Sequence, residues 1–257
     1  MEAPDGVVTL VLGFNNPVHV RDAAGGDLDE RQFDGINSRS LLVGLSTNAR
    51  IGTHNGKVDG VEVLLQPWAA FRLFGVAMHE VADSVADPEE VLGLRARRLA
   101  EALAPLSGWA ERFALLDSVL SGWAAEGPTG SPRVAWAWNQ LLRTDGMLPI
   151  HQLTEQTGWC SRQLNNRFRE QIGLPPKTAA RVLRLRRALR LLAAEFPLAD
   201  IATRCGFSDQ AHLNREFKSM IGCTPRQFLL IRESSVVSPA DSVERIPGEA
   251  TSVLLNI

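Results

Sequence analysis

The sequence of 257 residues has few cysteines and no long apolar run. Its three cysteines, Cys160, Cys205 and Cys223, are odd in number and scattered, which indicates a reducing cytosol and no disulfide framework. No run approaches the roughly 18 apolar residues of a membrane span. The acidic start MEAPDG is not typical of a signal peptide. We therefore expect a cytoplasmic protein without a membrane partner.

Signatures of catalysis and of metal binding are also missing. The sequence has no G-x-S-x-G, no Walker loop and no G-x-G-x-x-G. His19, His54 and His79 are widely spaced and form neither H-x-H nor H-E-x-x-H, so we interpret them as ordinary surface or turn histidines. The prediction is a protein that is not an enzyme and holds no cofactor or metal. The alternative is an N-terminal domain that is enzymatic or binds a small molecule, with the C-terminal part of the chain as an accessory module.

The net charge of −2 hides an uneven distribution. Residues 147–233 contain 14 Lys and Arg against 7 Asp and Glu, whereas residues 1–146 contain 12 against 19. A basic segment of this kind suits a polyanion, and an acidic front half suits a different partner. The length also allows two domains of ordinary size.

The first 75 or so residues favour strands, and helices follow. Runs rich in Val, Leu and Thr are separated by turn signals at 24–26, 55–56 and 59–60, and they predict a small, mostly antiparallel β domain. Apolar spacing predicts a helix over Phe71–Val81 and another over Trp109–Trp123. Asp87 is the expected N-cap of a helix that runs through LRARRLAEAL.

A linker, EGPTGSP at 126–132, separates this part from a purely helical one, with Ser131 as the expected cap of the next helix. The fold class is therefore α+β. The residues after 233 are expected to be loose, and whether their end, SVLLNI, docks as a strand is left open.

Two segments of the helical part repeat one another. LTEQTGWCSRQLNNRFREQIGLPPK begins at Leu153, and IATRCGFSDQAHLNREFKSMIGCTPR begins at Ile201. Each has Gly followed by an aromatic residue, then Leu-x-x-x-Phe, then Gly and Pro. Each copy predicts a short helix, a turn in which Gly takes a positive φ, and a second helix, which is the helix-turn-helix layout. Ser208 stands where we expect the N-cap of the last of these helices.

A helical wheel separates a core face from a polar face in both copies. The expected core residues are Leu164, Phe168, Ile172, Leu213, Phe217, Met220 and Ile221. The expected exposed residues are Arg162, Asn165, Asn166, Arg169, Gln210, Asn214, Arg215 and Lys218. Arg, Asn and Gln are the side chains that read guanine and adenine edges in the major groove. A solvated polar face is the alternative, but the repeat and the basic charge favour double-stranded DNA.

Residues 176–195 between the copies predict a basic amphipathic helix. About 18 residues at 1.5 Å each span roughly 27 Å, close to the roughly 34 Å turn of B-DNA. Such a rod is suited to place two recognition helices in adjacent major grooves, with its arginines solvated or near phosphates. A helix lying on a membrane surface ranks lower, because the spacer role explains both its length and its position.

Over about 148–232 the sequence resembles the AraC-type family of bacterial transcription regulators. The resemblance is carried by the repeat, by R-x-x-x-A-L-R-L-L from Arg184, and above all by I-A-x-x-x-G-F-S-D-Q from Ile201 with F-K-x-x-x-G-x-T-P-x-x-F from Phe217. It implies a DNA-binding module of two units, often fused to a sensing or dimerisation domain. The expected division is 1–130 for the N-terminal sensing or dimerisation domain, 131–233 for the DNA-binding domain, and 234–257 for the tail.

The resemblance also implies roles for single residues. By position, the base-contacting residues are Arg162, Asn165, Asn166, Arg169, Gln210, His212, Asn214 and Arg215. Ser161 and Ser208, beside helix N-termini, are the expected phosphate contacts. Two residues depart from the family pattern: Cys160 stands where Ser usually caps the first recognition helix, and Thr178 replaces a frequent aromatic. DNA-repair relatives need metal-bound cysteines in the N-terminal part, and all three cysteines follow residue 159.

Two questions stay open at this point. Trp109, Phe113 and Trp123 favour plain core packing, with a pocket for a small-molecule effector as the alternative. Pairing of two chains into a homodimer is the other role considered for the N-terminal part. The thiol of Cys160, flanked by arginines at a helix N-terminus, suggests oxidant sensing, although a small semi-buried residue is the favoured interpretation.

Overall fold

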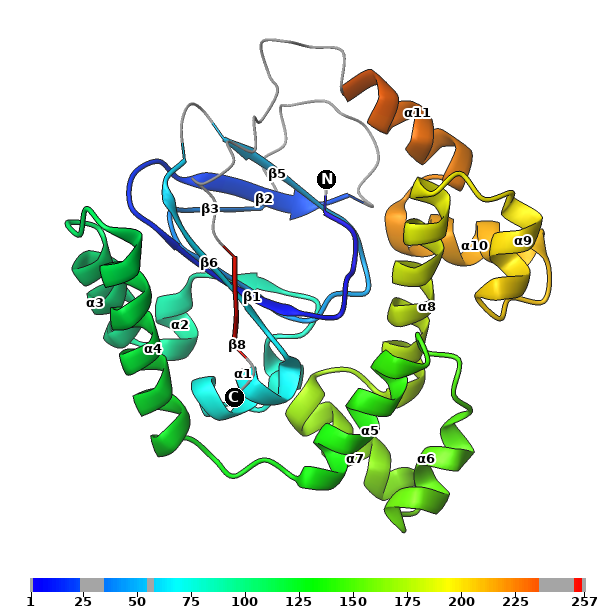
Figure 1. The fold of residues 1–257 in the computed structure, drawn as a ribbon, viewed down its shortest axis with the longest axis horizontal. Helices are drawn as coiled ribbons and strands as arrows, with labels where there is room; N and C mark the ends of the chain where they lie inside the picture. Colours follow the sequence, from blue (N-terminus) through cyan, green and yellow to red (C-terminus); the bar gives the residue numbers. More distant parts are fainter. Residues whose placement is uncertain (1, 24–34, 55–57, 236–251, 256–257) are drawn as a thin grey trace.

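A computed structural model describes residues 2–23, 35–54, 58–235 and 252–255. Two β-sheets lie at the centre of the view in Figure 1. Helices α2, α3 and α4 flank the sheets on one side, and helices α5 to α11 form an arc on the other side. The chain is therefore α+β, as the sequence predicts, with six strands before the first helix and β7 and β8 later in the described chain.

The five-stranded sheet has the order β7 (Val85–Ala86), β4 (Leu41–Val43), β1 (Val8–Gly13), β6 (Gly60–Leu65) and β8 (Ser252–Leu255). The three-stranded sheet has the order β3 (Ile36–Ser38), β2 (Val18–Asp22) and β5 (Arg50–His54). All strand pairs are antiparallel except β6–β8, which is parallel with Val63 opposite Val253. The end of the tail thus docks as a strand, whereas the turn signals at 24–26 and 55–56 and the tail residues 236–251 lie outside the described residues.

The helices of the N-terminal part are α1 (Pro67–Phe74), the short 3-10 helix η1 (Met78–Glu80), α2 (Pro88–Leu92), α3 (Leu94–Leu103) and α4 (Trp109–Glu126). The continuous helix predicted over Phe71–Val81 is wrong, because Gly75 takes φ 72° and ends α1 there. The single helix predicted from Asp87 through LRARRLAEAL is likewise wrong, because Gly93, with φ 63°, separates α2 from α3. The predicted cap at Asp87 is confirmed: its Oδ1 accepts the Glu89 N–H at 2.9 Å.

Seven helices cover the described residues after the linker: α5 (Pro132–Arg143), α6 (Ile150–Thr157), α7 (Ser161–Ile172), α8 (Pro176–Ala193), α9 (Leu198–Arg204), α10 (Gln210–Ile221) and α11 (Pro225–Ser235). Ser131 is the N-cap of α5, although its side chain makes no capping bond. The helix predicted between the two repeats is confirmed as α8, whose 18 residues begin at Pro176.

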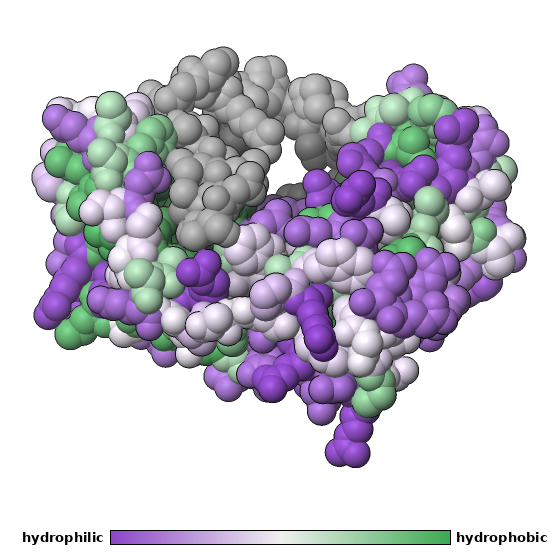
Figure 2. All heavy atoms as spheres, turned by 60° about the horizontal axis from the view of Figure 1, so that its bottom comes forward, coloured by the Kyte–Doolittle hydropathy of each residue, from purple (hydrophilic) through white to green (hydrophobic). Residues whose placement is uncertain are grey.

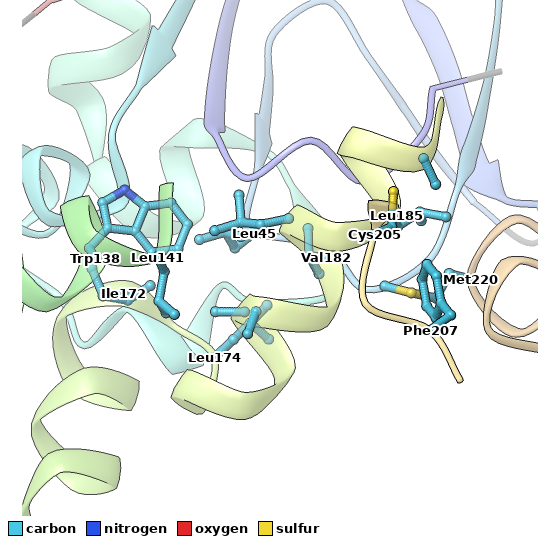
Figure 3. Packing of buried hydrophobic residues seen from close by; sticks show 14 of the residues in the cluster. Leu45, Trp138, Leu141, Ile172, Leu174, Val182, Leu185, Cys205, Phe207 and Met220 are labelled. Carbon is cyan, nitrogen blue, oxygen red and sulfur yellow. The ribbon is translucent and has the colours of Figure 1, made fainter. Parts of the chain in front are cut away.

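The buried residues form two hydrophobic clusters. One joins the five-stranded sheet to α1, α3 and α4 and contains Leu12, Val63 and Leu116. The other lies among α5 to α10, and Figure 3 shows part of it, including Trp138, Val182 and Met220. Leu45 and Ala49 belong to this second cluster although they precede the linker, so the N-terminal part contributes side chains to the helical core.

Candidate nucleic-acid interface

The first helix-turn-helix unit consists of α6 and α7. Gly158 between them takes φ 68°, which supplies the left-handed turn that the repeat predicts. Leu164, Phe168 and Ile172 are buried, as predicted, with Phe168 tilted against Trp138 at a ring distance of 6.3 Å. The opposite face carries Arg162, Asn165, Asn166 and Arg169, all exposed. Within the described part of the chain, these four side chains form no hydrogen bond or ion pair, so their donors and acceptors are available to a ligand.

The second unit consists of α9 and α10, with Gly206 at φ 71° in the turn. The predicted core residues Leu213, Phe217, Met220 and Ile221 are all buried. Gln210, Arg215 and Lys218 are exposed on the other side of α10. The two units thus present similar polar faces at the two ends of α8, as Figure 1 shows for the helices that carry them.

Two predicted base-contacting residues of α10 are less free than the others. Asn214 is half-buried, and its Oδ1 is shielded from solvent without a hydrogen-bond partner in the described structure. The His212 ring lies edge-on to Phe207 at 5.4 Å, and its Nδ1 accepts the Ser208 N–H at 3.3 Å. His212 therefore takes part in the turn before α10, whereas Gln210, Arg215 and Lys218 project freely.

The acids at the margins of both faces are paired with arginines. Glu170 accepts a bond from Arg167 at 3.0 Å. Glu216 accepts two bonds from Arg181 of α8, at 2.7 and 3.3 Å. Pairing offsets the negative charge that these carboxylates would present to a phosphate backbone. Sequence spacing does not reveal the Arg181–Glu216 pair, because it joins residues 35 apart.

The N-termini of the two recognition helices differ. The N-cap of α10 is Asp209 and not the predicted Ser208; the Asp209 Oδ1 accepts the His212 N–H at 2.6 Å. This bond, together with the Ser208 hydroxyl, holds the pKa of the Asp209 carboxyl below its usual value. The N-cap of α7 is Cys160, which makes no side-chain bond to the helix. The amides that begin α7, beside the exposed Ser161, are thus the more open to a phosphate, whereas a carboxylate occupies the equivalent place beside Ser208.

The arginines of α8 mostly bind neighbouring parts of the protein, contrary to the expectation that they are solvated or near phosphates. Arg187 pairs with Asp145 at 3.5 Å, and Arg190 pairs with the same carboxylate. Arg184 lies over the Phe207 ring at 5.6 Å, and burial lowers the pKa of its guanidinium. With Arg181 on Glu216, these residues fasten α8 to the turn before α6 and to the second unit. Helix α8 is therefore held by polar contacts on several sides.

The other candidate groups have structural surroundings. Trp109 stacks on Phe113 at 5.8 Å, and Arg95 lies over Trp123 at 4.8 Å, which favours the packing role. Cys160 is exposed, so the predicted semi-buried placement of its thiol is wrong. In the ranges that the structure describes, no group of three or more His, Cys, Asp or Glu is placed to hold a metal ion. Within the same ranges, no helix has the length and apolar character needed to cross a membrane.

Figure 2 shows hydrophilic residues over much of the surface on the right, the side that α6 to α10 occupy in Figure 1. The exposed polar residues of α7 and α10 named above contribute to this hydrophilic side. Two repeated faces rich in unpaired Arg, Asn and Gln, held by a fixed helical core, have the chemistry that base edges and phosphates require.

Comparison with known proteins finds similarity in the same part of the chain. Residues 153–230 match the family described as "Helix-turn-helix domain". The F1 operon positive regulatory protein of Yersinia pestis is 36% identical over 83 residues, which cover 32% of this chain and 28% of that protein. The HTH-type transcriptional activator RhaS of Escherichia coli (strain SE11) is 37% identical over 75 residues, 29% of this chain and 27% of that protein. The chain thus spans less than a third of the length of these relatives.

Solved structures show a distant likeness. The C-terminal domain of AraT, a response regulator from Geobacillus stearothermophilus, covers 47% of this chain and 99% of its own, with 21% identity and a TM-score of 0.38. ToxT from Vibrio cholerae O395 covers 90% of both chains, with 11% identity and a TM-score of 0.46.

Proposed function

We propose, on the premise that residues 153–230 are an AraC-type helix-turn-helix domain, that this protein is a sequence-specific DNA-binding transcription regulator. One observation carries the proposal: two repeated recognition helices expose unpaired Arg, Asn and Gln side chains at opposite ends of α8. Function on chromosomal DNA places the protein in the cytoplasm, and the proposal includes no catalytic step and no cofactor.

In this proposal the two recognition helices enter adjacent major grooves. Arg162, Asn165, Asn166 and Arg169 of α7, and Gln210, Arg215 and Lys218 of α10, face the bases. Asn214 and His212 contribute at the edge of the second site. Ser161 and the open N-terminus of α7 contact phosphate, whereas we assign Ser208 the smaller share because Asp209 lies beside it.

The division of the chain follows from the same reasoning. Residues 131–233 form the DNA-binding domain, and residues 1–130 form a sensing or dimerisation domain, with 234–257 as a tail. A cleft of about 390 Å³ between α1, the end of α4 and the start of α5 offers one place for a small-molecule effector. The indole Nε1 of Trp68, which lines this cleft, is buried without a partner among the described residues. Thermal-shift assays with candidate ligands test the effector role, and light scattering tests the homodimer.

Selection of bound sequences from random duplex DNA, followed by footprinting, tests the main proposal. We expect two base-specific patches about one helical turn apart. Replacing Arg215 or Asn166 by Ala should then cost on the order of 1–3 kcal/mol at the preferred site and relax specificity at one patch. Arg98→Ala is a charge-matched control, because Arg98 is exposed on α3 in the N-terminal part. An equal loss on all sequences would assign Arg215 or Asn166 to phosphate contact, and no enrichment of any sequence would contradict the proposal.

A further inference from the structure

The N-terminal part contacts the second helix-turn-helix unit directly. The backbone N–H of Ala49 donates to the carbonyl oxygen of Met220, in α10, at 2.7 Å. Ala49 and Leu45 are each 1% exposed and belong to the helical core. In the view of Figure 3, Leu45 lies between Trp138 and Leu141 of α5 on one side and Val182 of α8 on the other. The loop between β4 and β5 is thus built into the core that supports α10.

A neighbouring loop contacts the first unit. Helix α7 packs against η1, and the chain at the end of α7 comes close to the residues that follow η1. A Cβ at Gly173 would lie 3.0 Å from the carbonyl oxygen of Met78 and 3.3 Å from the Cβ of Ala82. Gly173 also has φ 103°, a conformation that glycine adopts without strain. The close approach of these two backbones therefore depends on the missing side chain.

The two loops are bonded to each other through Asp83. Its Oδ1 accepts the Thr47 N–H at 2.6 Å and the Thr47 hydroxyl at 2.8 Å. Its own N–H donates to the carbonyl oxygen of Leu45 at 2.9 Å, and its φ is 54°. We call residues 44–49 and 78–83 the brace. A continuous series of contacts thus runs from Met220, through the brace, to Gly173.

We infer that the brace fixes the placement of α7 relative to α10, and that Asp83 is its positioning residue; this inference rests on the proposed DNA-binding function. Figure 1 shows α8 beside the sheets, with α7 near one end and α10 near the other. Alone, α8 is a single connection, and long helices bend. The brace supplies a second connection between the same two units, which closes a ring. A ring of this kind opposes bending of α8 and so sets the distance and angle between the two base-reading faces.

Substitutions at Asp83 test the role of the brace without removing side chains from the hydrophobic core. Its side chain is exposed and belongs to neither hydrophobic cluster. Asp83→Gly removes the carboxylate but tolerates the positive φ. Asp83→Asn keeps an acceptor oxygen and also tolerates this conformation, so it is the conservative control. Leu45→Ala loosens the brace from the core side, and Leu12→Ala, a change of equal type in the other cluster, is its matched control.

The first measurement needs no DNA. Two nitroxide labels report the separation of the two units. One is attached to the exposed native Cys160 at the start of α7, and the other to a cysteine introduced by Ser219→Cys at an exposed position of α10. Cys223→Ser removes the half-buried third thiol, and the buried Cys205 stays. Pulsed electron resonance on the full chain should give a narrow distance distribution that broadens in Asp83→Gly and in Leu45→Ala. Asp83→Asn and Leu12→Ala should leave it narrow. Unchanged width in both brace variants would overturn the inference.

The second measurement uses the selected duplex and a version with one base pair inserted between its two patches. The insertion adds about 3.4 Å and rotates one patch by roughly 35°. The unaltered protein should lose about tenfold or more in affinity, the cost of a lost base contact. Asp83→Gly should lose several-fold less, because a flexible pair of units adapts to the new spacing. The same loss in Asp83→Gly as in the unaltered protein would count against the brace. Absence of any preferred duplex would instead contradict the proposed function, while the label distances would still test the brace.

Discussion

Replacing Cys160 by Ser should stabilise the protein. Cys160 occupies the N-cap of α7 with φ −68° and ψ 159°, an extended conformation that suits a capping residue, yet it makes no side-chain bond to the helix. The shorter and stronger acceptor of Ser reaches the N–H of the second or third helical residue from this position. The second unit illustrates the completed cap, because Asp209 accepts the His212 N–H at 2.6 Å.

The expected gain follows from the exposure of the site. Cys160 is exposed, so the exchange of sulfur for oxygen sacrifices little apolar burial. Capping by Ser, relative to a residue that does not cap, contributes about 0.5–1 kcal/mol in typical hosts. For a chain of this size, such a gain corresponds to a rise in Tm of about 1–4 °C.

Thermal unfolding followed by circular dichroism measures the rise, and hydrogen exchange at the first turn of α7 locates it. Cys160→Ala, which cannot accept a hydrogen bond, should show no gain. Cys223→Ser changes a half-buried thiol after the end of α10 and should leave the stability unchanged or lower it. An unchanged Tm for Cys160→Ser, with unchanged exchange in α7, would refute the capping argument.

Three further predictions concern other contacts. The pKa of Asp209 is lowered in the folded state. Its contribution to stability is therefore present above the unfolded value near 3.8 and is lost as the pH falls through the lower folded value. The stability of Asp209→Asn, measured by acid titration, should depend less on pH. Arg181→Ala should weaken binding to all DNA sequences because it leaves the carboxylate of Glu216 unpaired on α10, and adding Glu216→Gln should restore most of the loss in a binding assay at low salt. Gly146→Ala should lower the Tm markedly, since Gly146 has φ 72° and a Cβ there would lie 2.1 Å from the Ala180 carbonyl oxygen.

The helical part was predictable because its signals are local. Gly158 and Gly206 mark the turns, and the apolar spacing of Leu213, Phe217 and Ile221 defines the buried face of α10. The strands were harder to predict. β2, with Val18–Asp22, and β3, with Ile36–Ser38, are short and mixed in composition, and their pairing in the three-stranded sheet identifies them as strands.

The parts that the sequence did not predict depend on contacts between distant residues. The bonds between Asp83 and Thr47 join residues 36 apart, and no periodic pattern marks them. The sequence predicts Ser208 as the cap of α10, but Ser and Asp both cap helices well. Only the backbone conformation of Asp209, which is extended, identifies Asp209 and not its neighbour as the N-cap. The end of α1 at Gly75 likewise becomes clear only from the backbone conformation, since an isolated Gly is also tolerated inside helices.

The parallel pairing of β8 with β6 bears on how the protein is made. Residues 252–255 follow every described helix along the chain, yet they form one edge of a sheet whose other strands lie among the first 86 residues. The outer side of β6 therefore stays unpaired throughout synthesis of all the helices that follow it. An unpaired strand edge invites association with other chains. A nascent chain, or one truncated before Ser252, thus carries this open edge.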